Sequence, residues 1–562
     1  MADPFSIAVA GIAGAGVLVA GDKARKRFAL SRAKHPSLAG HARMGKRVAQ
    51  FIPFFSYDES RFFRADGADD AIAARRREGF FRLAAQFKAH YPKTLALTGE
   101  AHKGLSDLQF TSSYRVPFQF SPLVRAHLGT GVFLSASDGA ELVDPDGNRF
   151  IDLTGSYGVN LLGYDFYKQC IADGATTVEA LGPVLGAYHP VVASNVRRLC
   201  AISGLDEVSF HMSGTEAVMQ AVRLARYHTR RQRVVRFCGA YHGWWGDVQP
   251  GIGNPVPADR TLTLADMSEK TLRVLAQRRD IACVLVNPLQ ALHPNAGAPA
   301  DSALIDSSRR AHFDKAAYGD WLKRLAETCA KAGIVLIFDE VFVGFRLAPG
   351  GAAEYFGVQP DMITYGKTLG GGLPIGVLCG RADLMKRFRE DRPVDVCFAR
   401  GTFNSHPYVM GAMDAFLRRL ETPEVRAYYY DNLDARWNGR AEALNARLMA
   451  EDIPVQVANL QTIWTVFYTR PGRYNWMLQY YLRAHGLALS WVGTGRLIFP
   501  LNFSEAMFAQ FVERFVAAAK TMRQDGWWDA PAGLADKAIR RSVLREALAV
   551  RWPFLAAPAS AA

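Results

Sequence analysis

The sequence predicts an α/β protein in which a mostly parallel sheet is wrapped by helices. Strand-like apolar runs alternate with helical stretches, as they do when parallel strands are joined by crossover helices. These runs span residues 207–210, 234–237, 283–286, 334–338 and 362–365. The run at 334–338 is apolar at every position, which is typical of a strand buried on both faces. We therefore expect a catalytic cleft at the carboxyl ends of these strands, between domains and between subunits.

The chain divides into an N-terminal extension, a large domain, a smaller C-terminal α+β domain, and a final helix with a tail. We place these parts at residues 1–105, 106–404, 405–525 and 526–562. Strand signals at 463–468 and 496–499 support the smaller domain. With 562 residues, 49% of them hydrophobic, the chain can bury a substantial core in two or more domains.

The composition indicates a protein of a reducing compartment, and we expect it in the cytoplasm. Its seven cysteines are odd in number and form no CxxC pair. The net charge of +14 suits an acidic partner, such as a carrier protein or an anionic membrane surface. No nucleic-acid-binding motif is present, so nucleic acid ranks last among the partners.

The N-terminal extension begins with an uncharged segment at residues 4–21, followed by a basic run at 22–27. The segment lacks the basic start of a secretory signal, and its length is the minimum for a membrane span. A span or a membrane-surface contact through residues 4–27 is one interpretation. The favoured one is a docked or mobile tail rich in glycine and alanine.

Ser213 and Glu216 fit a helix capping box, because they follow a strand-like run and open a segment with helical periodicity. Such a box leaves the amides of Gly214 and Thr215 free at the positive end of a helix, where a phosphate binds well. A plain helix cap is the alternative.

Tyr241 stands on a glycine-flanked turn after another strand-like run, so its ring could lie against a flat cofactor. A core aromatic is the alternative. For His242 we favour a structural or ring-packing role, since no second histidine or cysteine stands at metal-ligand spacing and no metal site is expected.

Asp339 ends the apolar strand at 334–338, where a buried carboxylate needs a partner. Lys367 stands on a glycine-rich turn after the next strand-like run, and an amine in an apolar pocket can become a nucleophile that forms a Schiff base. A phosphate-binding loop is excluded, because Asp361 occupies the position of its first glycine. With such a lysine nearby, a pyridinium nitrogen is the most economical partner for Asp339.

In series, these motifs resemble the class III (omega-type) family of pyridoxal-phosphate aminotransferases, which includes glutamate-1-semialdehyde aminomutase. The resemblance covers roughly residues 110–525 and implies a fold type I transferase that uses pyridoxal 5'-phosphate. It rests on residues 213–217, 241–243, 338–346, 366–374 and 401–403.

The resemblance implies that Lys367 and Asp339 are catalytic: Lys367 forms the Schiff base and moves a proton, and Asp339 pairs with the pyridine nitrogen. Tyr241 would stack on the ring, and Thr402 would reach the phosphate of the neighbouring subunit, which implies a homodimer. Glu340 would lie on the phenolic side of the cofactor. The implied cofactor-binding residues are Ser213, Gly214, Thr215, Tyr241, His242, Asp339, Glu340, Lys367 and Thr402.

Four residues are candidates for the substrate site. Asn287 replaces the glutamate that the family usually has before proline, which puts the usual switch between acidic donor and acceptor in doubt. Arg115 is a candidate anion contact, with a surface residue as the alternative. Trp244 and Tyr157 would form an apolar pocket wall, or else lie in the core or at a dimer interface.

The predicted function is an aminotransferase that moves an amino group from an amine or amino-acid donor to a ketone or aldehyde. A resemblance to the aminotransferase domains of polyketide and peptide assembly lines indicates a hydrophobic or carrier-linked acceptor, and hence an acyl carrier protein as a partner. The alternatives are a glutamate-1-semialdehyde-type 2,1-aminomutase, and a membrane-associated or scaffolding protein of the same fold with weak activity.

Two further helices are expected outside the family resemblance. Residues 69–91 predict an amphipathic helix with a break near Gly79, and residues 535–550 predict a basic amphipathic helix. Both could recruit a carrier protein or a membrane, but packing around the dimer is the favoured interpretation.

Overall fold

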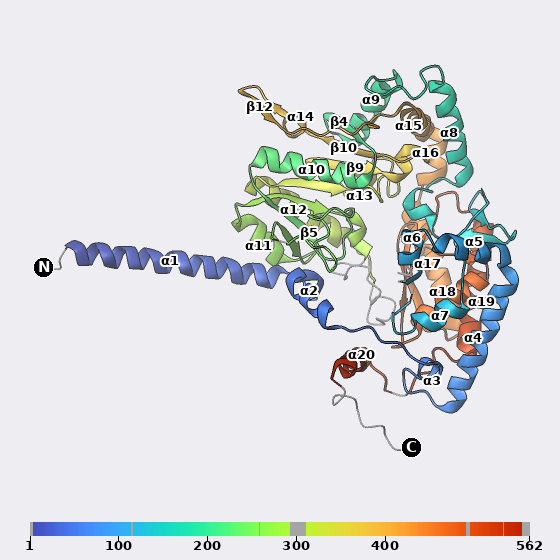
Figure 1. Cartoon of the computed structure of the whole chain (residues 1–562). Helices are drawn as coiled ribbons and strands as arrows, with labels where there is room; N and C mark the ends of the chain where they lie inside the picture. The colour runs from blue at the N-terminus through green and yellow to red at the C-terminus, as the bar shows by residue number, and fades with distance from the viewer. Residues whose placement is uncertain are drawn as a thin grey trace.

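The computed structural model describes residues 4–36, 38–113, 116–257, 259–292, 311–489, 495–531 and 533–552. Its centre is a seven-stranded sheet with the strand order β4-β10-β9-β8-β7-β5-β6 (Figure 1). Strand β10 runs antiparallel to both of its neighbours, and the other pairs are parallel. The bounds are β4 Glu207–His211, β5 Arg233–Phe237, β6 Thr261–Leu264, β7 Ile281–Val286, β8 Val335–Asp339, β9 Met362–Gly366 and β10 Gly376–Gly380.

The strands of this sheet are buried on both faces, as their unbroken apolar runs predict. In β8, Val335 and Ile337 pack in one hydrophobic cluster with the apolar side of α10 (Gly214–Thr229). Leu336 and Phe338 face the opposite side, in the cluster that includes α12 (Lys315–Ala332). All five predicted strands are present, and the sequence pattern missed the short edge strand β6 and the antiparallel β10.

The C-terminal region forms a three-stranded antiparallel sheet with the order β13-β14-β16. Its strands are β13 Val455–Leu460, β14 Ile463–Tyr468 and β16 Arg496–Ile498, so both predicted strands are found here. Helices α17 (Leu433–Ala450) and α19 (Glu505–Gln524) pack against this part of the chain. A separate four-stranded sheet joins β1 Ala136–Asp138, β2 Glu141–Val143, β3 Arg149–Asp152 and β15 Leu487–Ala488.

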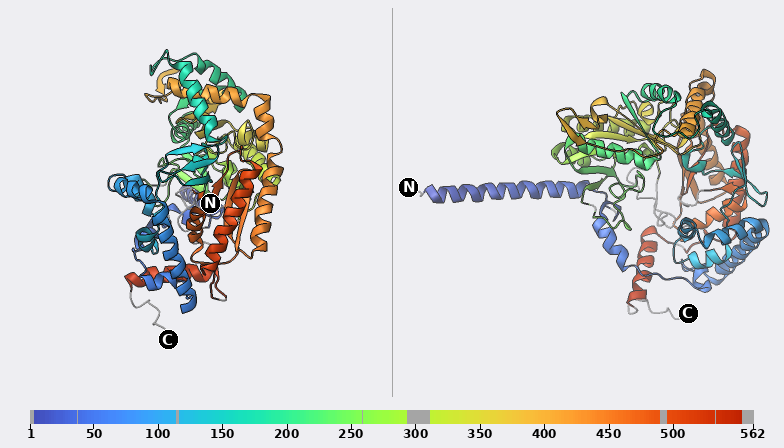
Figure 2. Two further views of the ribbon diagram at one scale, coloured as in Figure 1. Left: turned by 90° about the vertical axis from the view of Figure 1, so that its right-hand side faces the viewer. Right: turned by 45° about the horizontal axis from the view of Figure 1, so that its top comes forward.

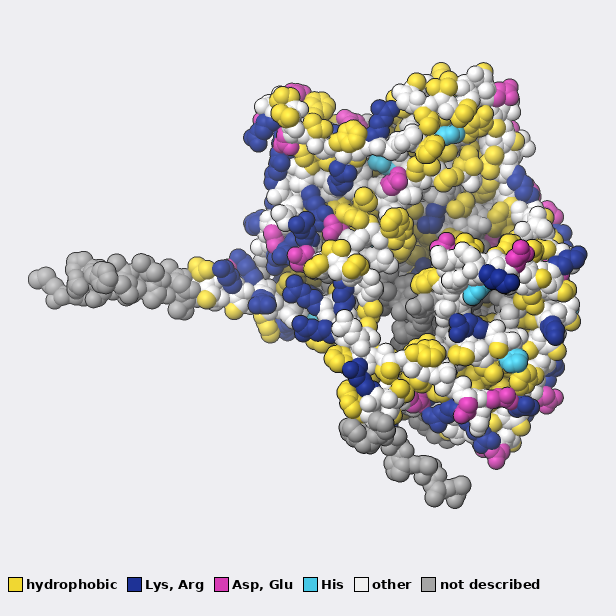
Figure 3. All heavy atoms as spheres, in the orientation of Figure 1, with side chains coloured by type: hydrophobic (Ala, Val, Ile, Leu, Met, Phe, Trp, Pro, Cys, Tyr) yellow, Lys and Arg dark blue, Asp and Glu magenta, His cyan; other side chains and the backbone are white. Residues whose placement is uncertain are grey.

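Helix α1 (Pro4–Ala33) projects from the body of the protein and meets it at its C-terminal end (Figures 1 and 2). There the amide of Ala265 donates to the carbonyl of Ala33 (2.9 Å), and Lys34 pairs with Leu264 of the edge strand β6. Lys and Arg side chains gather around this junction (Figure 3). The described part of the chain contains no helix that combines the length and the hydropathy of a membrane span. The side chains of residues 1–18 lie outside that part.

The extension then crosses to the C-terminal region through α2 (Ala42–Phe51) and α3 (Glu59–Phe63) and continues as α4 (Asp70–His90). The predicted break near Gly79 is wrong, because α4 runs through this residue. A side chain at Gly79 would overlap Asp525 at the end of α19, so the glycine permits close packing of the two segments.

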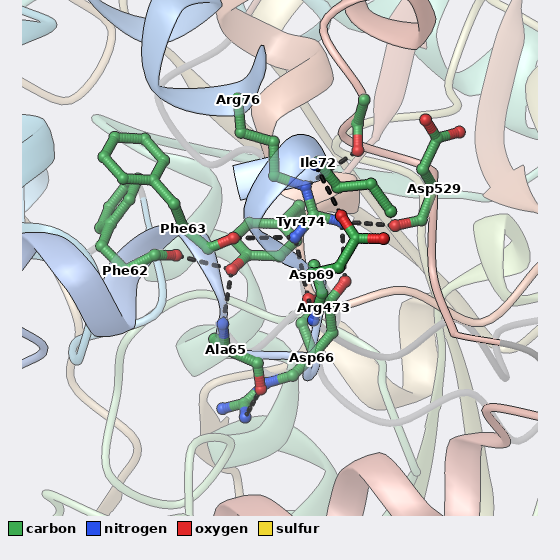
Figure 4. Close-up of polar contacts among 12 residues, drawn as sticks. Phe62, Phe63, Ala65, Asp66, Asp69, Ile72, Arg76, Arg473, Tyr474 and Asp529 are labelled. Carbon is green, nitrogen blue, oxygen red and sulfur yellow. Dashed lines mark hydrogen bonds and ion pairs between the residues drawn. The ribbon is translucent and has the colours of Figure 1, made fainter. Parts of the chain in front are cut away.

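Arg76 of α4 joins the extension to the C-terminal segment (Figure 4). Its guanidinium donates to both carboxylate oxygens of Asp66 at 2.8 Å and lies 4.5 Å from the centre of the Tyr474 ring. It also donates to the carbonyls of Gly526 (2.8 Å) and Asp529 (2.6 Å). The extension is therefore part of the folded core.

The final helix α20 (Asp536–Arg551) confirms the helix predicted at 535–550. Its Glu546 pairs with Arg473 (2.9 Å), which also donates to the carbonyl of Ala65 (2.6 Å). The N-terminal extension and the C-terminal helix thus meet on one buried arginine. Both segments pack within the chain itself.

Arg76→Met is expected to lower the free energy of unfolding by about 3–5 kcal/mol, because it leaves the buried Asp66 carboxylate without its cation. Arg75→Met is a matched control from the same helix: the Arg75 and Asp529 side chains are 48% and 39% exposed. That change should cost less than about 1 kcal/mol. Urea unfolding of the two variants tests this prediction, and equal losses would contradict it.

Candidate active site

The candidate residues follow the carboxyl ends of adjacent parallel strands. Lys367 follows β9, Asp339 ends β8, Asn287 follows β7, and Tyr241 and His242 lie on the loop after β5. Because β9, β8, β7 and β5 are neighbours in that order, their loops lie at one edge of the sheet. The predicted cleft location agrees with this arrangement.

Lys367 has a positive φ of 47° at the first turn after β9, a backbone conformation that L residues adopt at a cost. Its amine lies 5.5 Å from the centre of the Phe342 ring, and its aliphatic chain packs against Gly158. Burial lowers the pKa of Lys367; the Asp339 carboxylate opposes this change, and the Arg346 guanidinium reinforces it. This environment favours the neutral, nucleophilic form of the amine.

Asp339 is buried and forms a pair with the buried His242. The Oδ2 atom of Asp339 lies 2.8 Å from Nδ1 of His242, and Oδ1 accepts from the amide of Val341 (3.2 Å) and the hydroxyl of Thr364 (3.3 Å). Burial lowers the pKa of His242 against the pull of Asp339. Because a carboxylate can only accept, a neutral His242 donates from Nδ1. The histidine thereby orients Asp339.

The N-terminus of α10 is capped by Ser213, whose hydroxyl accepts from the amide of Glu216 at 3.3 Å. The second half of the predicted capping box differs, because the Glu216 carboxylate accepts from the amide of Met212 at 2.8 Å rather than from that of Ser213. The amides of Gly214 and Thr215 belong to the first helical turn, which cannot satisfy them itself.

Two glycines bring other segments against this helix end. A side chain at Gly243 would overlap Thr215, and one at Gly376 would overlap the carbonyl of Ser213. The loop after β5 and the start of β10 therefore touch the N-terminus of α10. The result is a backbone cradle with free amides and a positive helix end, which suits a phosphate group.

Asn287 fixes the loop that carries Tyr241. Its side-chain amide donates to the Tyr241 carbonyl, and its side-chain oxygen accepts from the amide of Leu289, both at 3.1 Å. Tyr241 is 55% exposed and Trp244 is 74% exposed, so neither is a core residue.

Tyr157 lies in η2 (Gly155–Gly158), where four successive residues have positive φ angles of 51°, 44°, 57° and 97°. The buried Asp152 accepts from the hydroxyls of Thr154 (2.6 Å) and Tyr164 (2.7 Å) beside this turn. Strain of this kind persists only where surrounding contacts enforce it. Tyr157 is 47% exposed, next to the Gly158 that touches Lys367.

Three further candidates are Glu340, Thr402 and Arg115. The Glu340 carboxylate accepts from the amides of Ala352 (2.6 Å) and Ala353 (2.9 Å), at the N-terminus of α13 (Gly351–Phe356). Burial raises the pKa of Glu340 to about 8. Thr402 is exposed on a turn, and Arg115 lies outside the described residues. The Glu340 carboxylate thus binds the N-terminus of α13, and its place on the phenolic side of the cofactor stays a prediction.

Sequence reasoning missed Phe342, whose ring centre lies 5.5 Å from the Lys367 amine, and Arg346, whose guanidinium carbon lies 5.8 Å from the same ring centre. Arg346 is the last residue of the motif at 338–346. The available signal was a lone arginine in the otherwise uncharged stretch 341–350, where a buried cation needs an explanation.

The chain is similar to known proteins over most of its length. The family model described as aminotransferase class-III matches residues 124–250 and 305–519, more than half of the chain. A glutamate-1-semialdehyde 2,1-aminomutase of Desulfotalea psychrophila is 32% identical over 378 residues, which cover 63% of this chain and 80% of that protein. A protein of the same name from Nitratidesulfovibrio vulgaris is 34% identical over 372 residues, with 65% and 84% covered.

Two solved structures share the fold. One is a glutamate-1-semialdehyde aminomutase from Pseudomonas aeruginosa, with a TM-score of 0.64 and 18% identity over 80% of this chain and 99% of that one. The other is an omega-transaminase from Sphaerobacter thermophilus, with a TM-score of 0.58 and 24% identity over 70% and 91%. At these identities the two structures support the fold alone.

Proposed function

The chain belongs to the class-III aminotransferase family of pyridoxal-phosphate-dependent, fold type I enzymes, and on that premise we propose that it transfers an amino group from an amine or amino-acid donor to a ketone or aldehyde. The observation that carries the proposal is that Lys367 and the Asp339–His242 pair lie at the same edge of the sheet, at the ends of the neighbouring strands β9 and β8. A neutral amine beside a buried carboxylate suits attachment of a pyridoxal group.

The residues of the site fit pyridoxal phosphate. The amides of Gly214 and Thr215 would hold the phosphate in the backbone cradle, and Tyr241 would cover a face of the ring. Asp339 would pair with the pyridine nitrogen, and Lys367 would attach the aldehyde carbon. When bound, the cofactor supplies a sink for the electron pair that remains on the substrate carbon after that carbon loses its proton.

Different residues of the chain would then move the proton, bind the cofactor's nitrogen and contact the substrate. Once the donor amine has displaced it from the cofactor, the Lys367 amine would accept the proton from the substrate carbon and deliver it to the carbon of the former aldehyde. Asp339, which His242 orients through a 2.8 Å contact, would hold a proton on the pyridine nitrogen. Asn287 holds the Tyr241 backbone, and the exposed Trp244 and Tyr157 provide apolar contacts for the substrate. These contacts favour a hydrophobic acceptor.

We also infer a homodimer in which Thr402 contacts the phosphate bound by the partner subunit. Thr402 is exposed in the single chain and is flanked by Phe398 and Phe403, which are 71% and 51% exposed. Apolar side chains of this size are usually covered by a partner when they lie together at a surface. Light scattering on the purified protein tests the dimer, and a monomer that binds the cofactor fully would contradict it.

The net charge of the protein bears on how the acceptor is delivered. An acyl chain on an acidic carrier protein would suit the net charge of +14. Four basic residues in the C-terminal half of α1, namely Lys23, Arg25, Lys26 and Arg27, are exposed and would suit either a carrier or a membrane surface. Binding to carrier protein and to anionic vesicles, compared at two salt concentrations, separates these partners.

A 2,1-aminomutase is the second candidate, because the two curated relatives bear that name. An aminomutase keeps the amino group on one molecule and consumes no net donor. Incubation with each candidate donor, with and without an added acceptor, distinguishes the two reactions.

The first experiment is the visible absorption spectrum of the purified protein before and after addition of a panel of amines and amino acids. We expect a yellow protein that bleaches with its donor. Borohydride reduction should then fix the cofactor's mass on the Lys367 peptide. A protein that stays colourless after incubation with pyridoxal phosphate, or a mass on another lysine, would overturn the proposal.

Asn287→Ala is expected to weaken cofactor binding roughly tenfold, because two hydrogen bonds that hold the Tyr241 loop are lost at about 0.5–1.5 kcal/mol each. Asn445→Ala is the matched control, since Asn445 also makes two bonds to main chain, to the amide (2.8 Å) and carbonyl (2.9 Å) of Val457. Titration with pyridoxal phosphate measures both variants. An effect of similar size in the control would refute a specific role for Asn287.

A further inference from the structure

Arg346 is a buried cation behind the candidate lysine, and no carboxylate pairs with it in the described chain. Its Nη1 donates to the Thr462 hydroxyl (2.9 Å) and the Phe499 carbonyl (2.8 Å), and its Nη2 lies 3.4 Å from the carbonyls of Gly158 and Asn160. The side chain is 1% exposed. A buried guanidinium held only by neutral acceptors is expensive, and such groups are retained where they serve a site.

The acceptors of Arg346 come from two parts of the chain, and one of them, Gly158, packs against the Lys367 side chain. Gly158 is the last residue of the turn that carries Tyr157, and Asn160 follows that turn. Thr462 precedes β14 and Phe499 follows β16 in the C-terminal sheet. The guanidinium carbon is 5.8 Å from the Phe342 ring centre, and the Lys367 amine is 5.5 Å from the same centre. Arg346 and Lys367 therefore share one aromatic neighbour.

We propose that Arg346 is a positioning residue of the active site, which holds residues 155–160 against the Lys367 side chain and places a fixed positive charge behind the Phe342 ring that both residues share. The inference rests on the proposed role of Lys367. Arg346 would touch neither substrate nor cofactor; it would act through Lys367 and through the turn at residues 155–158.

The charges around the lysine agree with this role. The charged groups that act on Lys367 are Asp339, which favours the protonated amine, and Arg346, which disfavours it. The ionisable neighbours of Arg346 are the phenols of Tyr167 and Tyr430, which are neutral because burial raises the pKa of each. Burial lowers the pKa of Arg346 only to about 10, so its charge persists at neutral pH.

Two variants separate the charge from the hydrogen bonds. Arg346→Gln keeps an amide donor but removes the charge, and Arg346→Lys keeps the charge but loses the fork that spans several acceptors. The first measurement is the pH at which Lys367 is half-acetylated in cofactor-free protein, read from the mass of its peptide. We expect this pH to rise by about one unit in Arg346→Gln and to stay near the wild-type value in Arg346→Lys.

The second measurement is the rate at which chymotrypsin cleaves the holoenzyme after Tyr157. Cleavage should become faster in both variants, because the carbonyls of Gly158 and Asn160 lose their common donor. Arg440→Gln is the control: Arg440 is 6% exposed and donates to Glu505 (2.6 Å) and Phe503 (2.9 Å) in the C-terminal region. It should change neither the labelling pH nor the cleavage at Tyr157.

An unchanged labelling pH in folded Arg346→Gln would overturn the electrostatic role. If that variant does not fold, unchanged cleavage at Tyr157 in Arg346→Lys would overturn the positioning role. The proposed function fails separately, if borohydride fixes no cofactor on Lys367 of the wild-type protein.

Discussion

Lys367→Ala is expected to lower the rate of amino transfer by at least about a thousandfold, since a positioned acid or base alone contributes about 10²–10⁴ in rate. The variant loses both the attachment of the cofactor and the group that moves the substrate proton. The measurement is single-turnover bleaching of the visible spectrum by saturating donor.

Because the pKa of Lys367 is lowered, the rate of the half-reaction should depend on pH. Burial lowers the pKa of the Lys367 amine, so the pH below which the wild-type half-reaction slows should lie below the pKa of an ordinary lysine. Lys367→Ala should lose this acid limb. Methylamine, added as a small free base, should restore part of the rate in the variant.

Lys315→Ala is the control for Lys367→Ala. Lys315 is a partly exposed lysine that pairs with Asp434 at 3.0 Å, and its loss should leave the half-reaction unchanged. Thermal unfolding of both variants checks that the fold persists. Retention of more than about a tenth of the wild-type rate in folded Lys367→Ala would be incompatible with the proposed mechanism.

The order of the strand-end residues explains why much of the site could be predicted. Apolar runs that end in Asp339 or lead to Lys367 indicate parallel strands, and such strands deliver their last residues to one edge. The strand pattern and the resemblance therefore placed Lys367, Asp339, Tyr241 and Ser213 at one edge together. Their exact partners, such as His242 for Asp339, required the fold.

The contacts that the sequence did not predict join distant segments. Gly79 was interpreted as a helix break, but it lies in an unbroken helix and makes room for Asp525, more than 400 positions later. Glu340 follows Asp339 directly, yet its carboxylate turns to the helix at 351–356. Local pattern carries no information on either contact. The same holds for Arg346, whose acceptors come from residues 158–160, 462 and 499.

Asp339→Asn is expected to reduce kcat roughly 10²–10³-fold, because breaking a buried charge pair costs about 3–5 kcal/mol. The amide can fill the same space and still accept from Val341, but it cannot stabilise a proton on the pyridine nitrogen. Binding of the cofactor's phosphate should persist, so the variant should remain coloured. Steady-state kinetics and a cofactor titration together test this expectation.

Asp414→Asn is the control, since Asp414 is also a buried carboxylate and pairs with Arg198 and Arg418, both at 2.8 Å. It should lower the unfolding temperature without changing kcat. A fall in kcat of the same size in both variants would mean that Asp339 acts through stability alone.

The pairing of Asp339 with His242 raises the question of whether His242 acts only by orienting Asp339 or contacts the reacting groups itself. If His242 acts only by orienting Asp339, His242→Asn should reduce kcat by a smaller factor, about tenfold, since one neutral or charge-assisted hydrogen bond contributes about 0.5–3 kcal/mol. In the Asp339→Asn background the histidine has no carboxylate to orient, so its removal should have almost no further effect. Full additivity of the two losses would instead require His242 to contact the reacting groups itself. The double variant therefore decides whether the buried pair acts as one unit, as its 2.8 Å contact implies.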